Sequence, residues 1–344
     1  MKIEVHSPNV RRREMDAVLT QLVEERIGPG EQAEKLLQIA KDNIHFDFAL
    51  AMRSPAAALV LALRAFAAAD GARGVVVSAL SPLYYARAIE EAGLIPVFCD
   101  VEDGQACVSA EKTRASVEGA EPVCCILLHE TLGFMPEMRP LLELGIPVIE
   151  DCSASYGARL GEERAGTFGV FVIMGIEERD MITGGGGALL YAMERRNASV
   201  LRSASPLPPE YGLPDMNAAM ALVQLREASR SAEKRSEIAR LYTDAALRGA
   251  RHKLFARPDD FEYNNYAFPL VLESGMKEAA AYARKKEIEI ETAFEHTLMG
   301  AGLVPEGLCP HARSLAMRTA LFPIYPRLGA EAASSVARLI QTLP

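Results

Sequence analysis

Short, continuous apolar runs alternate with amphipathic segments over the first three quarters of the chain. Such runs lack the polar alternation of half-exposed strands, so they are typical of strands covered on both faces. Strands that alternate with helices favour a parallel sheet flanked by helices. The pattern therefore predicts an α/β fold whose large domain holds a mostly parallel sheet of the seven-stranded type. The predicted strands are Phe46–Leu50, Gly74–Ser78, Ile95–Cys99, Val123–Leu128, Pro147–Asp151, Phe168–Met174 and Ala188–Ala192.

The segments between these runs have helical spacing and helix-end residues. Ser54 is a suitable N-cap for the helix that follows it, and Pro55 suits its first position. Gly93 suits the end of another helix. The predicted helices are Pro55–Ala69, Leu83–Ala92, Ala110–Val117 and Pro136–Leu144.

The character of the chain changes after Pro214. One long, charged helix is predicted over Met216–Leu247, and it resembles a connection between domains. We therefore expect a large domain over residues 1–248, with the connecting helix at about 214–248, and a small C-terminal α/β domain over 249–344. The small domain's predicted elements are a strand Ala267–Leu272, a helix Lys277–Lys286, a strand Ile288–Glu291 and a helix Gly329–Leu343.

Polar residues follow several predicted strands, where ligands bind in sheets of this kind. Ser54, Ser81, His129 and Asp151 fall at or just past the strand ends. Because the carboxyl ends of parallel strands share one edge, these side chains are candidates for a single site.

Composition excludes several classes of function. The 344 residues are 49% apolar and 24% charged, as in ordinary globular proteins. The net charge of −9 argues against nucleic acid as a partner, and Arg11–Arg13 is interpreted as a solvated helix start. The N-terminal residues lack the apolar core of a signal peptide, and the longest apolar stretch is too short to span a bilayer. We expect a cytoplasmic protein without a membrane partner.

The six cysteines do not form a zinc or iron–sulfur motif. No Cys-x-x-Cys pair occurs, and no histidine cluster accompanies the cysteines, so no metal site is expected. Several of them lie in or beside apolar runs, where a free thiol behaves as a small hydrophobic side chain. A reducing compartment is consistent with this usage. The cysteines are Cys99, Cys107, Cys124, Cys125, Cys152 and Cys309.

Six segments, in order, resemble the DegT-type sugar-nucleotide aminotransferases of the fold-type I pyridoxal phosphate (PLP) enzymes. The first four match a strand ending in Asp-Val, a His-containing loop, a Glu-Asp-x-Ala-Gln-x-x-Gly-Ala segment and two glycine signatures. The last two match an Ala-Ala-x-x-x-x-Gln-Leu helix and a Leu-Pro-x-Tyr-Pro segment. They are Ile95–Val101, Leu128–Gly133, Ile149–Ala158, Gly166–Gly169 with Thr183–Ala188, Ala218–Leu225 and Phe322–Pro326.

The resemblance implies a fold, a cofactor and an assembly. Fold-type I proteins are generally homodimers with a small-molecule site at the subunit interface, so a homodimer is expected. Asp151 falls on the carboxylate that pairs with the cofactor's pyridinium nitrogen. A strand-end Asp that caps a turn is an equally weighted interpretation. Ser54 is the remaining candidate for the cofactor's phosphate, and the expected ligand pocket holds His129, Tyr84, Tyr85, Ala154 and Arg179.

The family's reacting group is missing from this chain. No lysine occurs between Lys112 and Lys234, and the position of the Schiff-base lysine falls on Arg179. A guanidinium stays protonated, so it has no lone pair to attack an aldehyde. The phosphate-binding Ser-Gly-Thr falls on Ser54-Pro55-Ala56, which lacks one N–H and one hydroxyl. A ring-contacting Gln falls on Ala154, a phosphate-binding serine on Met174, and the stacking aromatic near Pro82, close to Tyr84 and Tyr85.

Three functions compete at this point. The first is a family member without transaminase activity that binds a small molecule, such as a sugar nucleotide, or serves as a partner of an active paralogue. The second is a PLP- or PMP-dependent sugar aminotransferase or dehydratase that works without the usual lysine, with His129 the one nearby histidine in sequence. The third is an ordinary aminotransferase that takes a lysine from a distant segment or another subunit. The first is favoured, with no catalytic residue expected, no cofactor expected and any PLP or PMP bound non-covalently.

Two loop segments have both a binding and a structural interpretation. The glycines Gly184–Gly187 suit a phosphate cradle, but they also suit a tight turn that needs positive φ, which is favoured. Glu177–Asp180 is interpreted as a solvated loop. The alternative is that Arg179 pairs with a ligand carboxylate or phosphate.

Overall fold

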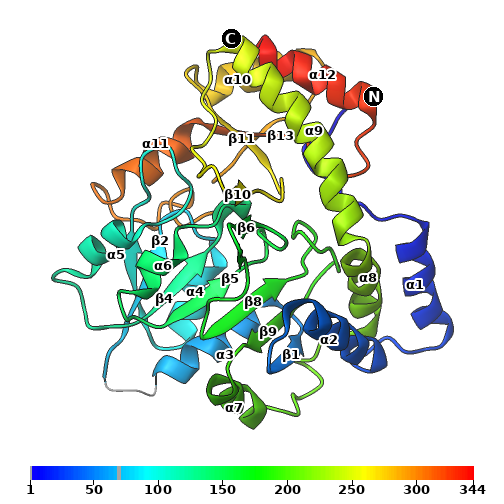
Figure 1. The fold of residues 1–344 in the computed structure, drawn as a ribbon, viewed down its shortest axis with the longest axis vertical. Helices are drawn as coiled ribbons and strands as arrows, with labels where there is room; N and C mark the ends of the chain where they lie inside the picture. The colour runs from blue at the N-terminus through cyan, green and yellow to red at the C-terminus, as the bar shows by residue number, and fades with distance from the viewer. Residues whose placement is uncertain (1, 68–70) are drawn as a thin grey trace.

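The structure is a computed structural model that describes residues 2–67 and 71–344. Its centre is a seven-stranded sheet in the order β1-β9-β8-β5-β4-β2-β3. Neighbouring strands from β8 to β3 are parallel, and β9 runs antiparallel to both of its neighbours (Figure 1). The fold-class prediction is confirmed. The strands are β1 (Phe48–Met52), β2 (Gly74–Ser78), β3 (Ile95–Cys99), β4 (Val123–His129), β5 (Val148–Asp151), β8 (Phe171–Gly175) and β9 (Ala188–Ala192).

Helices cover both faces of this sheet, as the unbroken apolar runs require. One face packs against α3 (Pro55–Ala67), α4 (Tyr84–Glu91) and α7 (Arg195–Ser203). The other face packs against α2 (Glu31–Ile44), α8 (Asp215–Arg226) and α6 (Met138–Leu142). Helix α5 (Ala110–Val117) lies beside β3 and α6. Burial of two apolar faces is the main stabilising contribution to such a sheet.

The predicted helices of the large domain are present with shifted ends. The helix predicted over Pro55–Ala69 is α3, and its last two predicted residues lie outside the described part of the chain. Ser54 caps α3, because its Oγ accepts the Ala57 amide at 3.2 Å. Helices α1 (Arg12–Val23) and α2 were not predicted, although α1 begins within the arginine cluster that was interpreted as a helix start.

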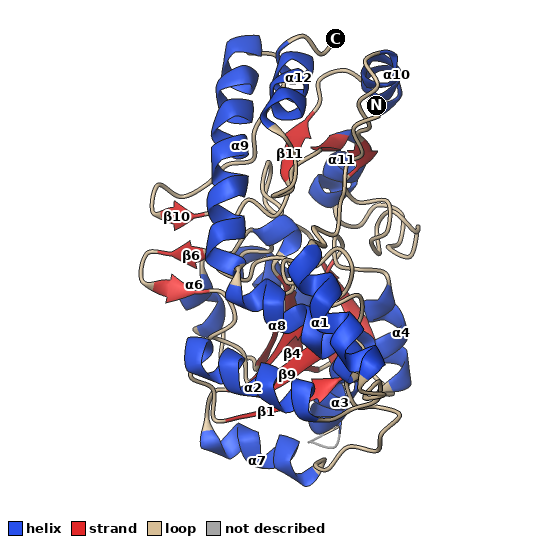
Figure 2. Cartoon of the chain, turned by 90° about the vertical axis from the view of Figure 1, so that its right-hand side faces the viewer, coloured by secondary structure: helices blue, strands red, loops and turns tan. Residues whose placement is uncertain are grey.

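The single long helix predicted over Met216–Leu247 is wrong. The structure has two helices, α8 and α9 (Ala228–Gly249), separated by Glu227 with φ −95° and ψ 6°. The two helices bury different faces: α8 packs in the core of the large sheet, whereas α9 packs in the core of the small domain against α12 (Ala330–Gln341). A straight helix does not satisfy both contacts. Figure 2 shows α9 running from the large sheet to the helices near the C-terminus.

The small domain holds a three-stranded antiparallel sheet in the order β11-β13-β12. Its strands are β11 (Phe268–Val271), β12 (Glu291–Thr292) and β13 (Thr319–Phe322), and its helices include α10 (Met276–Lys285) and α11 (Pro310–Arg318). The predicted strand Ile288–Glu291 is wrong, because Ile288 forms only an isolated bridge to Ile3 and the strand begins at Glu291. The central strand β13 was not predicted. A further small sheet has the order β10-β6-β7, from β6 (Arg159–Leu160), β7 (Glu163–Arg164) and β10 (Phe261–Glu262).

Glu150 on β5 anchors the glycine signature at residues 166–169. Its fully buried carboxylate accepts the backbone amides of Gly166, Phe168 and Gly169 at 2.5, 2.8 and 2.9 Å. A Cβ on Gly169 would lie 2.9 Å from the Glu150 Cβ, so glycine permits this close approach. The signature therefore wraps backbone donors around a buried acid and fixes the loop that precedes β8.

Candidate functional site

A cleft of about 350 Å³ lies between the carboxyl edge of the large sheet and the small-domain strands β12 and β13. Most of the predicted site residues line it: Tyr84, His129, Asp151, Ala154 and Arg179. Tyr85 does not line the cleft, but its hydroxyl contacts Asp151. Ser54 is adjacent through Pro55, which does line it. The topology thus brings the predicted residues to one place.

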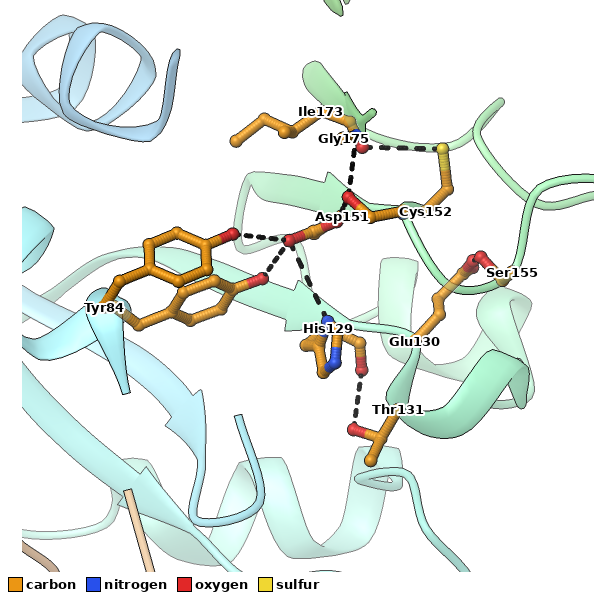
Figure 3. A network of polar contacts seen from close by, with 11 residues as sticks. Tyr84, His129, Glu130, Thr131, Asp151, Cys152, Ser155, Ile173 and Gly175 are labelled. Carbon is orange, nitrogen blue, oxygen red and sulfur yellow. Dashed lines mark hydrogen bonds and ion pairs between the residues drawn. The ribbon is translucent and has the colours of Figure 1, made fainter. Parts of the chain in front are cut away.

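Asp151 at the end of β5 is the centre of the site, and its carboxylate is fully engaged. Oδ2 accepts the hydroxyl of Tyr85 at 2.5 Å and that of Tyr84 at 3.2 Å. Oδ1 accepts the Ser153 amide at 3.0 Å and the Ser153 hydroxyl at 2.5 Å. Figure 3 shows the phenol of Tyr84 aimed at this carboxylate. Four donors saturate a group with about four acceptor positions.

Burial keeps the two phenols in their donating form. Burial, and next the charge of Asp151, raises the pKa of both Tyr84 and Tyr85 well above the usual value. Their rings pack edge to face with centroids 4.9 Å apart. The two tyrosines expected in the ligand pocket therefore form a hydrogen-bonded cap on Asp151.

His129 at the end of β4 faces the same carboxylate at a longer distance. Its Nδ1 lies 3.9 Å from Asp151 Oδ2 and has no hydrogen-bond partner. Burial lowers the pKa of His129, and the Asp151 charge offsets this only in part. A neutral imidazole beside the cleft is a potential proton acceptor.

Arg179 occupies the loop after β8, where the resemblance places the lysine. Its Nη1 donates to Glu291 Oε1 at 2.8 Å, so the guanidinium pairs with an acid of β12 across the cleft. No lysine lines the cleft within the described part of the chain. The structure therefore brings no primary amine side chain into the site.

The start of α3 does not form an open anion site. Pro55 has no N–H, the Ala57 amide donates to Ser54 Oγ, and the Ala58 amide donates to the Ser54 carbonyl at 3.2 Å. Among the first four residues of α3, the amide of Ala56 is therefore the one left to bind an anion. The residues present do not fit PLP as the family would hold it. Arg179 replaces the amine, Pro55 and Ala56 replace two phosphate donors, and the carboxylate expected to pair with the ring nitrogen, Asp151, already accepts hydrogen bonds from protein groups.

The glycine run between β8 and β9 forms a tight turn, as its favoured interpretation holds. Gly185, Gly186 and Gly187 have φ of 72°, 141° and 125°, conformations that suit glycine. The amides of Gly184 and Gly186 donate to the Ile176 carbonyl, and that of Gly187 donates to Glu177. These donors are used within the loop.

The cleft carries more carboxylates than guanidinium groups. Its acids are Asp151, Glu177, Asp180, Glu291 and Glu295, against two arginines, Arg179 and Arg235. Arg235 of α9 is buried and donates through Nη1 to the carbonyls of Asn265, Tyr266 and Ile324. Burial lowers its pKa to about 10, so it keeps its charge at neutral pH. Both guanidinium groups are therefore engaged with protein acceptors.

Asp180 is the most strongly perturbed acid of the cleft. Burial raises its pKa to about 7, although its Oδ2 accepts the Glu177 amide at 2.7 Å. Because Asp180 titrates in this range, the charge of the cleft changes near neutral pH.

Gly175 leaves room for the polar groups behind Asp151, because a Cβ at this position would lie 2.7 Å from Ser153 Oγ.

Several residues that line the cleft were not predicted from the sequence as pocket residues. Arg235 is one of many charged residues in a helical pattern, and periodicity alone does not separate it from solvated neighbours. Glu291 lies in a predicted strand of a different domain, so its approach to Arg179 depends on how the domains pack. His6, Asp180 and Glu295 also line the cleft without having been predicted as pocket residues.

Neither a metal site nor a membrane-spanning helix is found in the described part of the chain. Residues 2–67 and 71–344 contain no group of three or more His, Cys, Asp or Glu placed to hold a metal ion. None of the helices described there is both long and apolar enough to cross a membrane.

The chain has the fold of solved aminotransferase structures. It superposes on the aminotransferase TlmJ from Streptoalloteichus hindustanus with a TM-score of 0.89 at 18% identity, over 99% of this chain and 98% of that one. Residues 8–341 match the DegT/DnrJ/EryC1/StrS aminotransferase family, and the chain belongs to this family.

Curated relatives are similar at low identity. The dTDP-4-dehydro-2,3,6-trideoxy-D-glucose 4-aminotransferase of Saccharopolyspora spinosa is 24% identical over 95% of this chain and 92% of its own length. The L-glutamine:2-deoxy-scyllo-inosose aminotransferase of Streptomyces lividus is 29% identical over 40% of this chain. The matched part of this chain spans a third (33%) of that relative's length.

Proposed function

We propose that this family member does not carry out transamination and instead binds a small molecule in its cleft. The contacts of Asp151 carry the proposal: Tyr84 and Tyr85 already donate to the oxygen that a cofactor ring nitrogen would need. The pairing of Arg179 with Glu291, in a cleft without lysine, supports the same conclusion. We propose that no cofactor is held covalently.

The charge of the cleft supports a class of ligand. Its carboxylates outnumber its arginines, and each arginine already donates through Nη1 to protein acceptors. A sugar nucleotide brings phosphate charges that need free cationic donors. A neutral or amine-bearing polyhydroxyl compound avoids that requirement and complements the acids. We therefore favour an amine-bearing sugar or cyclitol over the nucleotide-linked sugar that the family resemblance suggests.

A thermal-shift comparison tests this ligand class. A ligand that binds only the folded state raises stability by about 2.7 kcal/mol at a hundred times its Kd. We expect glucosamine to raise the Tm more than UDP-glucose, PLP or PMP does. The gain should increase as pH rises toward 7, because Asp180 loses its proton in this range while the ammonium group of glucosamine keeps its charge. Asp180→Asn should remove the pH effect, whereas Asp42→Asn at an exposed position of α2 should not. A larger gain with UDP-glucose would refute the amine preference.

Restoring the lysine tests whether the rest of the site is also unsuited to the cofactor. Arg179→Lys should remain inactive in amino transfer from glutamate or glutamine, and after incubation with PLP it should retain no visible absorbance band once free PLP is removed. The reason is that Asp151 and the start of α3 stay engaged as before. Amino transfer by this single variant would show that Asp151 and the start of α3 are available to the cofactor, and it would overturn that part of the proposal. Amino transfer by the wild-type chain would overturn the proposal as a whole.

A second candidate is a PLP- or PMP-dependent sugar aminotransferase or dehydratase that works without the usual lysine. The curated relatives named above are aminotransferases, and this favours the second candidate. His129, with its unpartnered Nδ1, is the residue placed to move a proton. Turnover of a keto sugar nucleotide with PMP, lost in His129→Asn, would establish this function in place of the first.

We also propose a homodimer, on the family resemblance alone. Light scattering after size-exclusion chromatography should give twice the mass of the 37.3 kDa chain. The mass of a single chain would contradict it.

A further inference from the structure

The start of β4 contains a register irregularity at two adjacent cysteines, Cys124 and Cys125. In the pairing of β2 with β4, Gly74 lies opposite Val123 and Val75 lies opposite Cys125. Cys124 is therefore an extra residue without a partner in this ladder, as in a β-bulge. A bulge interrupts the alternation of side chains between the two faces of a sheet.

Packing shows that both cysteines lie on one face. Cys124 and Cys125 pack with the apolar residues beneath α3 and α4, whereas Val123 and Ile126 pack on the opposite face, beneath α6. The two sulfurs lie 3.9 Å apart, and Cys124 Sγ also lies 3.3 Å from the Gly74 carbonyl oxygen. The irregularity has thus turned neighbouring residues into a pair of facing thiols.

This pair is poorly suited to a disulfide. Neighbouring Cα atoms across a trans peptide are about 3.8 Å apart, below the roughly 4.4–6.8 Å usual for disulfides. The thiols are therefore placed close together without an easy route to oxidation against each other.

We propose that Cys124 and Cys125 form a two-thiolate binding site for a soft, two-coordinate cation of the Cu(I) class. Thiolates select soft ions of this kind. Two metal–sulfur bonds of about 2.3 Å, the length known for zinc, can join sulfurs up to roughly 4.6 Å apart, and 3.9 Å lies within that span. Binding forms two S–Cu bonds and releases the two thiol protons, with copper remaining monovalent.

Access and acidity favour Cys124 over the other cysteines as the thiol that an ion meets first. Cys124 is partly exposed, and its hydrogen bond with Cys125 lowers the pKa of Cys124 to about 7, whereas the same contact, and next burial, raises the pKa of Cys125 well above its usual value. Burial raises the pKa of Cys99 and of Cys309 to about 12 each. The described residues supply no third His, Cys, Asp or Glu ligand around a common point. A tetrahedral zinc site is therefore disfavoured, and two-coordinate ligation remains.

Anaerobic titration with Cu(I), in competition with the chelator bicinchoninate, tests the site. The wild-type chain should hold one Cu(I), and Cys124→Ser should hold none. Cys309→Ser, which changes a cysteine outside the pair, is the matched control and should still hold one. Failure of the wild type to hold Cu(I), or equal retention by Cys124→Ser, would overturn the proposal.

Alkylation of the wild-type chain gives a second readout that does not depend on folding of a variant. With limiting iodoacetamide, peptide mass spectrometry should find Cys124 modified first, and one equivalent of Cu(I) should protect it. If Cu(I) leaves the alkylation of Cys124 unchanged, the ion does not bind there and the proposal is wrong.

Discussion

Two neighbouring carboxylates on β5 show what this chain keeps and what it changes. Glu150 accepts three backbone amides of the glycine signature, and Asp151 accepts two tyrosine hydroxyls, one serine hydroxyl and one amide. Backbone donors come with the fold whatever the side chains are, whereas hydroxyl donors depend on particular residues. A few substitutions can therefore alter the chemistry at Asp151 while the architecture around Glu150 persists.

The sharpest test of this comparison removes each acid in turn. Glu150→Ala leaves three amides without an acceptor, and each such buried donor costs about 1–3 kcal/mol. We expect a loss of roughly 3–9 kcal/mol in the free energy of unfolding. Asp151→Ala should cost less, because hydroxyls can rotate and the cleft can admit water. Urea denaturation measures both, and equal losses would show that the two acids do not differ as described.

The second test uses pH. Glu130 is buried beside Glu150 and accepts the hydroxyl of Ser155. Burial, and next the charge of Glu150, raises the pKa of Glu130 well above the ordinary value. The folded chain therefore binds this proton more tightly than the unfolded chain does. Stability should fall as pH rises from about 4.3 through the raised pKa, with a limiting slope of about 1.4 kcal/mol per pH unit.

Glu130→Gln should flatten this pH dependence, because an amide does not titrate. The exposed Glu143→Gln is the matched control and should leave the slope unchanged. Denaturation midpoints between pH 5 and pH 8 provide the measurement. An unchanged slope in Glu130→Gln would mean that another group is responsible.

The smallest effect is expected at the ion pair that spans the cleft. Arg179 and Glu291 are 56% and 29% exposed, so water screens their attraction. Glu291→Gln should change the free energy of unfolding by no more than about 1 kcal/mol. It should also free the guanidinium and improve binding of inorganic phosphate, as measured by calorimetry. A large loss of stability would instead assign the pair a structural role in joining the domains.

The sequence was most informative where burial on both faces dictates structure. All seven strands of the large sheet were predicted, because continuous apolar runs between turn residues leave few alternatives. The break at Glu227 and the central strand β13 were missed, since each depends on packing between elements far apart in sequence. The approach of Tyr84 and Tyr85 to Asp151 has the same origin. Motif spacing indicated that the residues were near the site but not that their hydroxyls would point at the carboxylate.

A crystal structure grown with excess PLP shows which groups occupy the carboxylate of Asp151. We expect Tyr84 and Tyr85 still to donate to Asp151, with no pyridine ring in contact with that carboxylate. A PLP ring whose nitrogen lies on Asp151, with the two phenols displaced, would contradict this expectation.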